Sequence, residues 1–389
     1  MQGMGDRDLL MIPGPIELEP TVLAAMAEKQ RGHLDPVFIK RFSRVQKRLR
    51  EVFRAPTAQP FVLAGSGTLA MELAVANLVQ PGEAALVVNT GYFSDRMALA
   101  LTRHGATVTQ VKAPPGQVPP MEEVERALAV ALHKVMTITH VDTSTGVLTP
   151  VQELAALARK AGVLCIVDGV CSVGAEALDQ ETWGVDVALT ASQKALGAPP
   201  GLAIVSVGKR AMEAYRARTQ PVRSLYLDLG EWLPVHEAYE AEKPSYFATP
   251  PVNLISALDV SLGLILDEGL PTRFARHVRM ANAMQAAWKA LGLKALPASE
   301  GLVAHTLSAL YYPTGVDATL VKAVAAQGIT IAGGLHPDLK AKYFRVGHMG
   351  AVSANDVLAT VAAVERALLA SRHQVEPGSG VSAAERALG

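Results

Sequence analysis

Short apolar runs alternate with longer amphipathic stretches between about residues 36 and 210. Apolar residues spaced three and four apart predict helices, and short β-branched runs between turn residues predict buried strands. Helices that alternate with buried strands are typical of a parallel sheet with helical crossovers. The pattern therefore predicts an α/β fold, with seven strands at Phe61 to Ala64, Ala85 to Asn89, Thr107 to Val111, Lys134 to Val141, Val163 to Asp168, Asp186 to Ala191 and Leu202 to Val207.

One helix boundary is marked by several residues at once. Thr149 and Gln152 have the spacing of a capping box, Pro150 suits the first helical position, and Gly162 can end the helix. We therefore expect this helix to lead directly into the strand that begins at Val163.

Beyond about residue 255 the pattern changes to longer helices. It predicts one long helix, a helix from Asp317 as a candidate N-cap to Gln327, a strand at Ile329 to Ile331, and a helix at Ala354 to Leu368. These elements indicate a smaller α+β domain at residues 261–372, after a large domain at 21–260. Residues 373–389 are rich in Pro, Gly and Ser, which predicts a loosely held, flexible tail with at most a helical turn at Ala383 to Leu388.

Composition narrows the class of protein. A chain of 389 residues is long enough for two or three packing units, and half of its residues are apolar. The 36 basic side chains balance 36 acidic ones, which argues against disorder and against an electrostatic binder of nucleic acids or membranes. A small molecule is therefore the expected partner.

The sequence offers neither a disulfide framework nor a metal motif. Cys165 and Cys171 are its only cysteines, and its ten histidines lack His-Glu-x-x-His or similar spacing, so we expect no metal. Met1 to Asp6 lack a basic segment followed by an apolar one, and no apolar run approaches the roughly 18 residues of a membrane span. We expect an unexported, cytoplasmic protein.

The first candidate for chemistry is the turn Gly65-Ser66-Gly67-Thr68, between a predicted strand and a predicted helix. Such a turn presents free N–H groups and a helix N-terminus to an anion, which predicts a phosphate site. With Ala70 the glycines also match a dinucleotide fingerprint, but that site needs an acid at the end of the next strand, where Asn89 stands. A plain strand-to-helix turn is the alternative interpretation.

Two further candidates follow predicted parallel strands. Asp168 closes its strand at the sheet edge where α/β proteins bind ligands, although it could instead cap the next helix. Lys194 lies just beyond the strand that ends at Ala191, among small residues. A buried amine there would have a lowered pKa and attack an aldehyde, whereas an exposed surface lysine is the ordinary alternative.

A phosphate cradle, a buried acid and a reactive lysine together match the needs of pyridoxal phosphate. The lysine binds the aldehyde, the acid keeps the pyridine nitrogen protonated, and the helix end holds the phosphate. An ion pair at an effective dielectric near 20 contributes about 4 kcal/mol at about 4 Å, which can raise the pyridine pKa by a few units. The protonated ring then acts as an electron sink.

With these residues the sequence resembles the class V, fold-type I pyridoxal-phosphate aminotransferases, and among them the alanine–glyoxylate and serine–pyruvate aminotransferases. The likeness covers nearly all of the chain except the tail. It rests on blocks that follow one another in the family's order: Pro13-Gly14-Pro15, Gly65 to Thr68, Ser144 to Leu148, Val167-Asp168, Ser192 to Leu196, Ala198 to Gly201, and Arg345-Val346-Gly347.

The resemblance implies a role for each matching position near the cofactor. Lys194 would be the Schiff-base lysine and Asp168 the partner of the pyridinium nitrogen. Thr143 falls near the ring oxygen, and Phe93 falls where relatives stack an aromatic, commonly tryptophan, on the ring. Plain helix core is the alternative for Phe93. The phosphate would be held by Ser66, Gly67, Thr68 and Gln193.

Other matching positions concern the substrate and the partner subunit. Arg345 matches the arginine that pairs with a substrate α-carboxylate, and Gly14, in the N-terminal segment 1–20, would lend backbone groups to that pocket. Tyr246 and Thr249 occupy positions that reach the neighbouring subunit's cofactor phosphate, which implies a homodimer with shared active sites. His33 lies where relatives line the entrance, although an ordinary loop histidine would fit as well.

The expected reaction is a two-stage, ping-pong amino transfer from alanine or serine to glyoxylate or pyruvate. The alternatives are another donor such as ureidoglycine or aminoethylphosphonate, a class V lyase, and a non-catalytic pyridoxal-phosphate-binding protein. Arg345 favours a carboxylate over a phosphonate amine. A desulfurase needs a thiol on a mobile loop, which Cys165 and Cys171 do not provide, and the retained lysine and aspartate argue against a non-catalytic protein.

Overall fold

A computed structural model describes residues 8–389. The prediction that Met1 to Asp6 carry no export signal concerns residues outside this range. At its centre is a seven-stranded sheet in which six strands run in one direction and β10 (Leu202–Val207) alone runs in the other. In spatial order the strands are β2 (Gln59–Ala64), β10, β9 (Val187–Ala191), β8 (Leu164–Asp168), β5 (His133–Thr139), β3 (Ala84–Asn89) and β4 (Thr107–Lys112). All seven predicted strands are confirmed, with small shifts at their ends.

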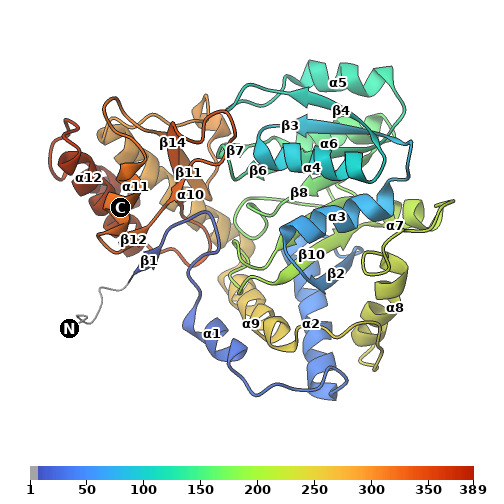
Figure 1. Ribbon diagram of the computed structural model, residues 1–389. Coiled ribbons are helices and arrows are strands. Elements are labelled where there is room, and N and C mark those ends of the chain that lie inside the picture. The colour runs from blue at the N-terminus through green and yellow to red at the C-terminus, as the bar shows by residue number, and fades with distance from the viewer. Residues whose placement is uncertain (1–7) are drawn as a thin grey trace.

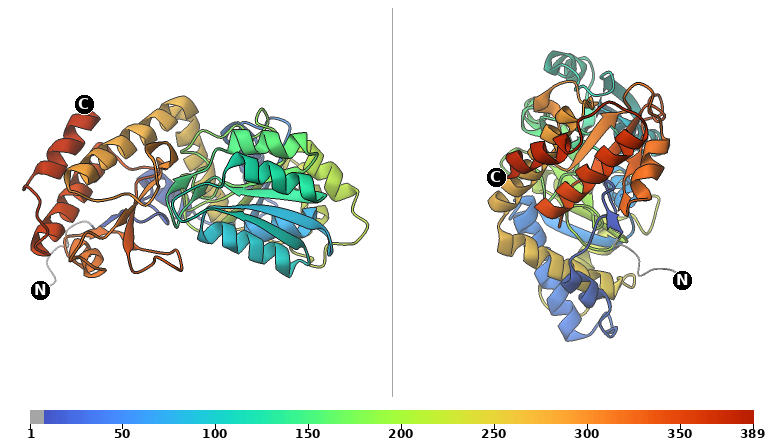
Figure 2. Two further views of the ribbon diagram at one scale, coloured as in Figure 1. Left: turned by 90° about the horizontal axis from the view of Figure 1, so that it is seen from above. Right: turned by 90° about the vertical axis from the view of Figure 1, so that its left-hand side faces the viewer.

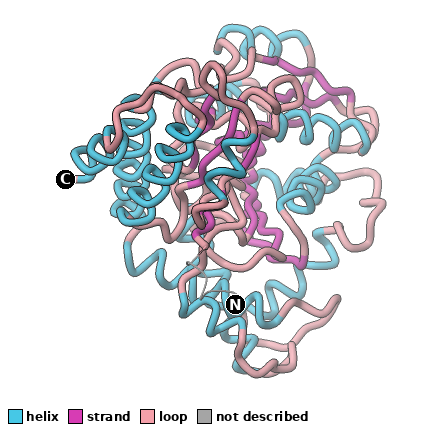
Figure 3. The backbone as a smooth tube through the Cα atoms, turned by 60° about the vertical axis from the view of Figure 1, so that its left-hand side comes forward, coloured by secondary structure: helices cyan, strands magenta, loops and turns pink. Residues whose placement is uncertain are grey.

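Helices cover both faces of this sheet (Figure 1). Successive strand residues point to opposite faces, so Val62 joins one apolar core and Phe61 the other. One face is covered by α2 (Pro36–Phe53), α5 (Met121–Val130), α6 (Val151–Lys160) and α9 (Val252–Glu268), and the other by α3 (Gly67–Leu78), α4 (Tyr92–Arg103) and α7 (Lys209–Arg216). The result is a three-layer arrangement that confirms the predicted α/β fold, with strands at the centre of the molecule (Figure 3).

The C-terminal part packs beside the sheet (Figure 2). It contains a three-stranded sheet in the order β11 (Leu307–Tyr311), β14 (Tyr343–Gly347) and β13 (Ala332–Gly333). Around it lie α10 (Leu270–Ala290), α11 (Thr319–Ala325) and α12 (Ala354–Ala370). The N-terminal strand β1 (Leu9–Leu10) pairs with β12 (Ile329–Thr330), so the first described residues belong to this part.

The remaining elements connect these layers. They are α1 (Pro20–Met26), the hairpin of β6 (Val141–Asp142) and β7 (Val147–Leu148), α8 (Leu229–Glu240) and the short 3₁₀ helix η1 (Glu300–Leu302). Within residues 8–389, no helix is long and apolar enough to cross a membrane.

Two helix predictions need correction. The long helix expected after residue 255 is interrupted at Gly269, whose φ of +80° is a conformation that suits glycine, so α9 and α10 are separate. The capping box at Thr149 and Gln152 is wrong as well, because the Thr149 hydroxyl donates to the Thr139 carbonyl at 2.8 Å. The helix begins at Val151 without a side-chain cap.

The prediction of a loosely held tail is also wrong for its last residues. Ser379–Leu388 form α13, which packs against α10 and α12. Ala384 is fully buried in the apolar core of the C-terminal part, and Glu365 of α12 accepts the Gly380 N–H at 2.9 Å. The final helix is therefore part of this core.

Ala384→Asp should destabilise the protein, because it places an unpaired carboxylate in an apolar contact. We expect a loss of about 2 to 4 kcal/mol in the free energy of unfolding, measured by urea denaturation. Ser382→Asp, at an exposed position of the same helix, is the matched control and should change little. Equal unfolding midpoints for the two variants would mean that α13 does not pack on the core.

Candidate active site

Asp168 and Lys194 reach the same edge of the sheet. Strands β8 and β9 pair in parallel, with Asp168 beside Leu189, and the chain continues from Ala191 through a turn to Lys194. Only 3% of Asp168 and 8% of Lys194 is exposed. The two ionisable groups thus lie out of water at neighbouring strand ends, the place where open α/β sheets bind ligands.

Burial shifts both groups towards their neutral forms. Burial raises the pKa of Asp168 to about 7, although the Val170 N–H, which donates to Oδ1 at 3.0 Å, acts in the other direction. Burial also lowers the pKa of Lys194; Cys171 and Asp168 oppose this shift, and the Arg345 guanidinium adds to it. A more easily deprotonated amine is a better nucleophile, and a buried carboxyl group favours a cationic partner.

The N-terminal segment closes over the lysine. Lys194 Nζ donates to the Pro13 carbonyl, and the Gly347 N–H donates to the Met11 carbonyl at 2.7 Å. A Cβ atom on Gly14 would lie 2.7 Å from Lys194 Nζ, and Gly14 has a φ of +88°. Glycine is required here both by its backbone conformation and by the close approach of the lysine.

The turn before α3 has the properties of an anion site. Ser66 is the N-cap of α3 but makes no side-chain capping bond, so the first N–H groups of the helix stay free. A Cβ on Gly67 would lie 2.9 Å from Val170 Cγ2, which places the turn against the segment that follows Asp168. Gln193 Oε1 is buried without a hydrogen-bond partner in the described part of the chain. The open helix end fits the phosphate of pyridoxal phosphate, and the NH2 group of the Gln193 amide, next to Lys194 in the sequence, is the part of that side chain that could donate to it.

The loop after β6 joins this edge to the start of α4. Asp142 accepts hydrogen bonds from the Ser144 N–H at 2.9 Å and from the Phe93 N–H at 3.2 Å. Burial raises the pKa of Asp142, and these hydrogen bonds oppose that shift. Thr143 is buried between the bonded residues. The sequence positions Phe93 and Thr143 are therefore brought together by an aspartate that the sequence analysis did not single out.

Arg345 reaches the site from the C-terminal part. Its Nε donates to the Gly333 carbonyl at 2.9 Å and its Nη1 to the Thr143 carbonyl at 3.0 Å. Tyr343, two residues earlier on β14, donates to the Ser144 carbonyl. Two side chains of one strand thus hold the loop at Thr143 and Ser144, and Arg345 forms no ion pair within residues 8–389.

Tyr246 and Thr249 are not brought to this cluster by their own chain. Tyr246 is 61% exposed, and its ring lies 5.1 Å from the ring of His33. Thr249 is exposed in the same connection between α8 and α9. Their predicted role is to contact the cofactor phosphate of a second subunit. The structure contains one chain, so this role stays a prediction.

Both cysteines are buried, and burial raises the pKa of each thiol. A protonated, inaccessible thiol is a poor nucleophile. Within the described ranges, no group of three or more His, Cys, Asp or Glu side chains is arranged to hold a metal ion.

Several residues around the site could not be predicted from the sequence. They are Arg96, Asp142 and Tyr343, whose hydrogen bonds span 28, 49 and 199 positions of sequence, where periodicity carries no signal. The available local signals were the Asp142-x-Ser144 spacing of an Asx turn and the i, i+4 spacing of Tyr92 and Arg96 on a helix.

Comparisons with known proteins point to one family. The family model of class V aminotransferases matches residues 20–352. Alanine–glyoxylate aminotransferase 1 of Saccharomyces cerevisiae is 40% identical over 90% of this chain and 93% of its own, and L-aspartate–glyoxylate aminotransferase of Paracoccus denitrificans is 33% identical over 98% and 96%. The crystal structure of ureidoglycine–glyoxylate aminotransferase from Bacillus subtilis superposes with a TM-score of 0.92, at 28% identity over 100% and 99% of the two chains.

The family match, the relatives and the open α/β sheet with its buried lysine and aspartate lead to one assignment. The chain belongs to the class V aminotransferases and is a fold-type I aminotransferase that uses pyridoxal phosphate.

Proposed function

We propose that this enzyme transfers the amino group of alanine or serine to glyoxylate or pyruvate in two half-reactions. The observation that carries the proposal is the Arg345 guanidinium, fixed by two carbonyls, without an ion-pair partner in the described residues, and close enough to Lys194 to lower its pKa. A planar guanidinium is suited to bind a carboxylate with two hydrogen bonds. An amino acid bound there would bring its amino group towards Lys194.

The relatives support a small carboxylate substrate. Each of the three relatives above has glyoxylate in its name, and the one with the highest identity of these three is named for alanine as well. The relatives named for aspartate and ureidoglycine share this fold and have different donors in their names. The fold therefore does not identify the donor, and alanine or serine is proposed from the similarity to the alanine enzyme and from Arg345.

Lys194 and Asp168 would carry the chemistry. Pyridoxal phosphate supplies an aldehyde that takes the amino group and a protonated ring that accepts an electron pair. Lys194 Nζ would be displaced by the substrate amine and would then move the α-proton, for which its lowered pKa is suited. Asp168 would hold the proton on the pyridine nitrogen, and that cation would in turn keep the aspartate ionised.

The other residues would hold the cofactor in place. We assign the phosphate to the open start of α3 and to the amide of Gln193, and the ring to Phe93 and Thr143, with Gly14 shaping the substrate side. Tyr246 and Thr249, exposed in one subunit, would complete the site of the other in a homodimer. A cytoplasmic location stays a prediction.

The donor is tested by single half-reactions. The enzyme loaded with pyridoxal phosphate is mixed with one amino acid at a time, and the loss of the cofactor's visible absorbance is followed. Alanine and serine should convert the cofactor, and glyoxylate or pyruvate should restore its absorbance. Conversion only by aspartate, ureidoglycine or aminoethylphosphonate would refute the proposed donor and leave the family assignment unchanged.

Arg345→Gln should weaken substrate binding without abolishing cofactor binding. Loss of a charged hydrogen-bond pair should lower kcat/KM for alanine by about 10- to 100-fold. Arg345→Lys, which keeps the charge but loses the planar fork, should recover part of this loss. An unchanged kcat/KM in the glutamine variant would show that the carboxylate binds elsewhere.

Asp168 should make the cofactor-free enzyme less stable as the pH rises from 4 to 7. Its folded-state pKa of about 7 lies above the ordinary value near 4, so the stability that the protonated group contributes is lost as the pH rises through this window. Asp168→Asn keeps an acceptor for the Val170 N–H but cannot ionise. At pH 7 the cofactor-free variant should therefore unfold at higher urea than the wild type, and the difference should vanish near pH 4. An equal difference at both pH values would contradict this account.

A further inference from the structure

The guanidinium of Arg96 contacts both Thr68, the second residue of α3, and the ring of Phe93. Its Nη1 donates to Thr68 Oγ1 at 3.0 Å, and its Nη2 donates to the Tyr92 hydroxyl at 3.2 Å. Its Cζ lies 5.0 Å from the ring centroids of both Phe93 and Tyr92, within cation–π range. One cation therefore contacts both the turn assigned to the phosphate and the ring assigned to the pyridine.

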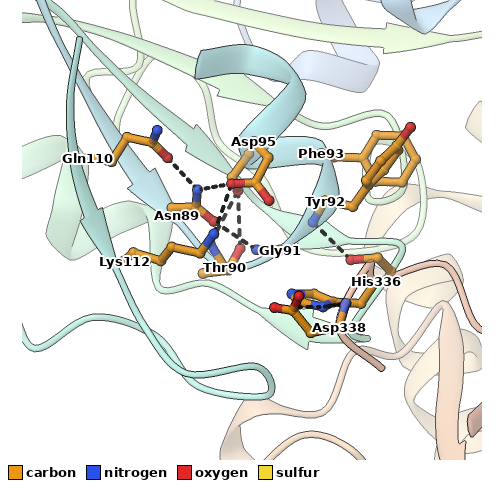
Figure 4. A network of polar contacts seen from close by, with 12 residues as sticks. Asn89, Thr90, Gly91, Tyr92, Phe93, Asp95, Gln110, Lys112, His336 and Asp338 are labelled. Atoms are coloured by element: carbon orange, nitrogen blue, oxygen red, sulfur yellow. Dashed lines mark hydrogen bonds and ion pairs between the residues drawn. The ribbon is translucent and has the colours of Figure 1, made fainter. Parts of the chain in front are cut away.

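The start of α4 is fixed by a polar network (Figure 4). The Gly91 N–H donates to Asn89 Oδ1 at 3.1 Å, and Asn89 Nδ2 donates to Asp95 Oδ1 at 2.7 Å. Lys112 Nζ also donates to this Asp95 oxygen, at 3.1 Å. The acid next to Arg96 in the sequence is thus paired with another cation, and Arg96 itself forms no ion pair among residues 8–389.

The hydrogen bond from Arg96 decides which way the Thr68 hydroxyl can donate. A hydroxyl has one donor hydrogen, and an oxygen that accepts from a guanidinium keeps this hydrogen free to point away from the cation. Accepting a charged hydrogen bond also polarises the O–H group and makes it a stronger donor. The Thr68 hydroxyl hydrogen is therefore oriented to donate to an anion beside the start of α3.

The charge of Arg96 matters for the same ligand. The other groups assigned to the phosphate, the N–H groups of α3 and the amide of Gln193, are neutral. A phosphate with nearly two negative charges is stabilised by a cation held close to it. Among the charged side chains with described contacts to this turn, Arg96 is the one that supplies a positive charge.

We propose that Arg96 is a cofactor-positioning residue that orients the Thr68 hydroxyl towards the phosphate, holds the Phe93 ring, and supplies positive charge to the phosphate site. This proposal rests on the proposed roles of Thr68 and Phe93 as cofactor contacts.

The test measures cofactor and phosphate affinity in Arg96→Gln, Arg96→Lys and Thr68→Val. The cofactor-free protein is titrated with pyridoxal phosphate, followed by absorbance, and with inorganic phosphate, followed by its competition with the cofactor. Arg103→Gln, which removes the same charge from an exposed position of α4, is the matched control. Melting temperatures of the cofactor-free variants report on folding.

We expect Arg96→Gln to weaken both ligands by about 10- to 100-fold relative to Arg103→Gln, as for a lost charged hydrogen bond. Its melting temperature without cofactor should match that of the control. Arg96→Lys should recover phosphate affinity in part, but it should not restore the visible circular dichroism of the bound cofactor, which reports on ring orientation. Adding Thr68→Val to Arg96→Gln should cost less affinity than Thr68→Val alone, because the two residues act together.

The outcomes separate this proposal from the one on which it rests. If Thr68→Val weakens both ligands but Arg96→Gln does not, Arg96 has no such role and the phosphate site stands. Independent, multiplicative losses in the double variant would also overturn the positioning role. If neither single variant changes either affinity, both the assignment of the phosphate to this turn and the proposed role of Arg96 fail.

Discussion

Burial at the carboxyl ends of β8 and β9 changes what Asp168 and Lys194 can do. In water both would be charged at neutral pH, but here each is almost fully enclosed and its pKa moves towards the physiological range. Keeping such groups out of water costs stability, and proteins hold them where a ligand can use them. In the proposed site, a cofactor with a cationic ring and an aldehyde would pair with the carboxylate by its charge and with the amine by a covalent bond.

The surroundings of the pair come from three distant segments. The N-terminal segment covers Lys194 through the Pro13 carbonyl, and the glycine that follows leaves room for the amine. Strand β14 holds the loop around Thr143 through Tyr343 and Arg345. Strands β1 and β14 both belong to the C-terminal part, so the side of the proposed site that Arg345 and Gly14 form depends on how this part packs against the central sheet. Changes in that packing would alter the proposed substrate side and leave Asp168 and Lys194 in place, which fits relatives that share the fold and are named for different donors.

Much of the fold and the central pair could be predicted from the sequence. Buried parallel strands are short apolar runs with a polar residue at the end, and the runs before Asp168 and Lys194 have this form. Features that depend on distant partners could not be predicted. Helix α13 is too short to be recognised alone and is held by α10 and Glu365, and the Thr149 hydroxyl prefers a carbonyl ten residues away to the helix it precedes. Asp142 and Arg96 act on neighbours that only the folded chain brings close.

The central claim is that Lys194 is the amine that binds the cofactor. Borohydride reduction of the enzyme loaded with pyridoxal phosphate fixes the cofactor to its lysine, and proteolysis followed by mass spectrometry identifies the labelled peptide. The account predicts the label on the peptide that contains Ser192-Gln193-Lys194 and no label in Asp168→Ala, whose cofactor affinity should be lost. A label on any other lysine, with Lys194 unmodified, would contradict it.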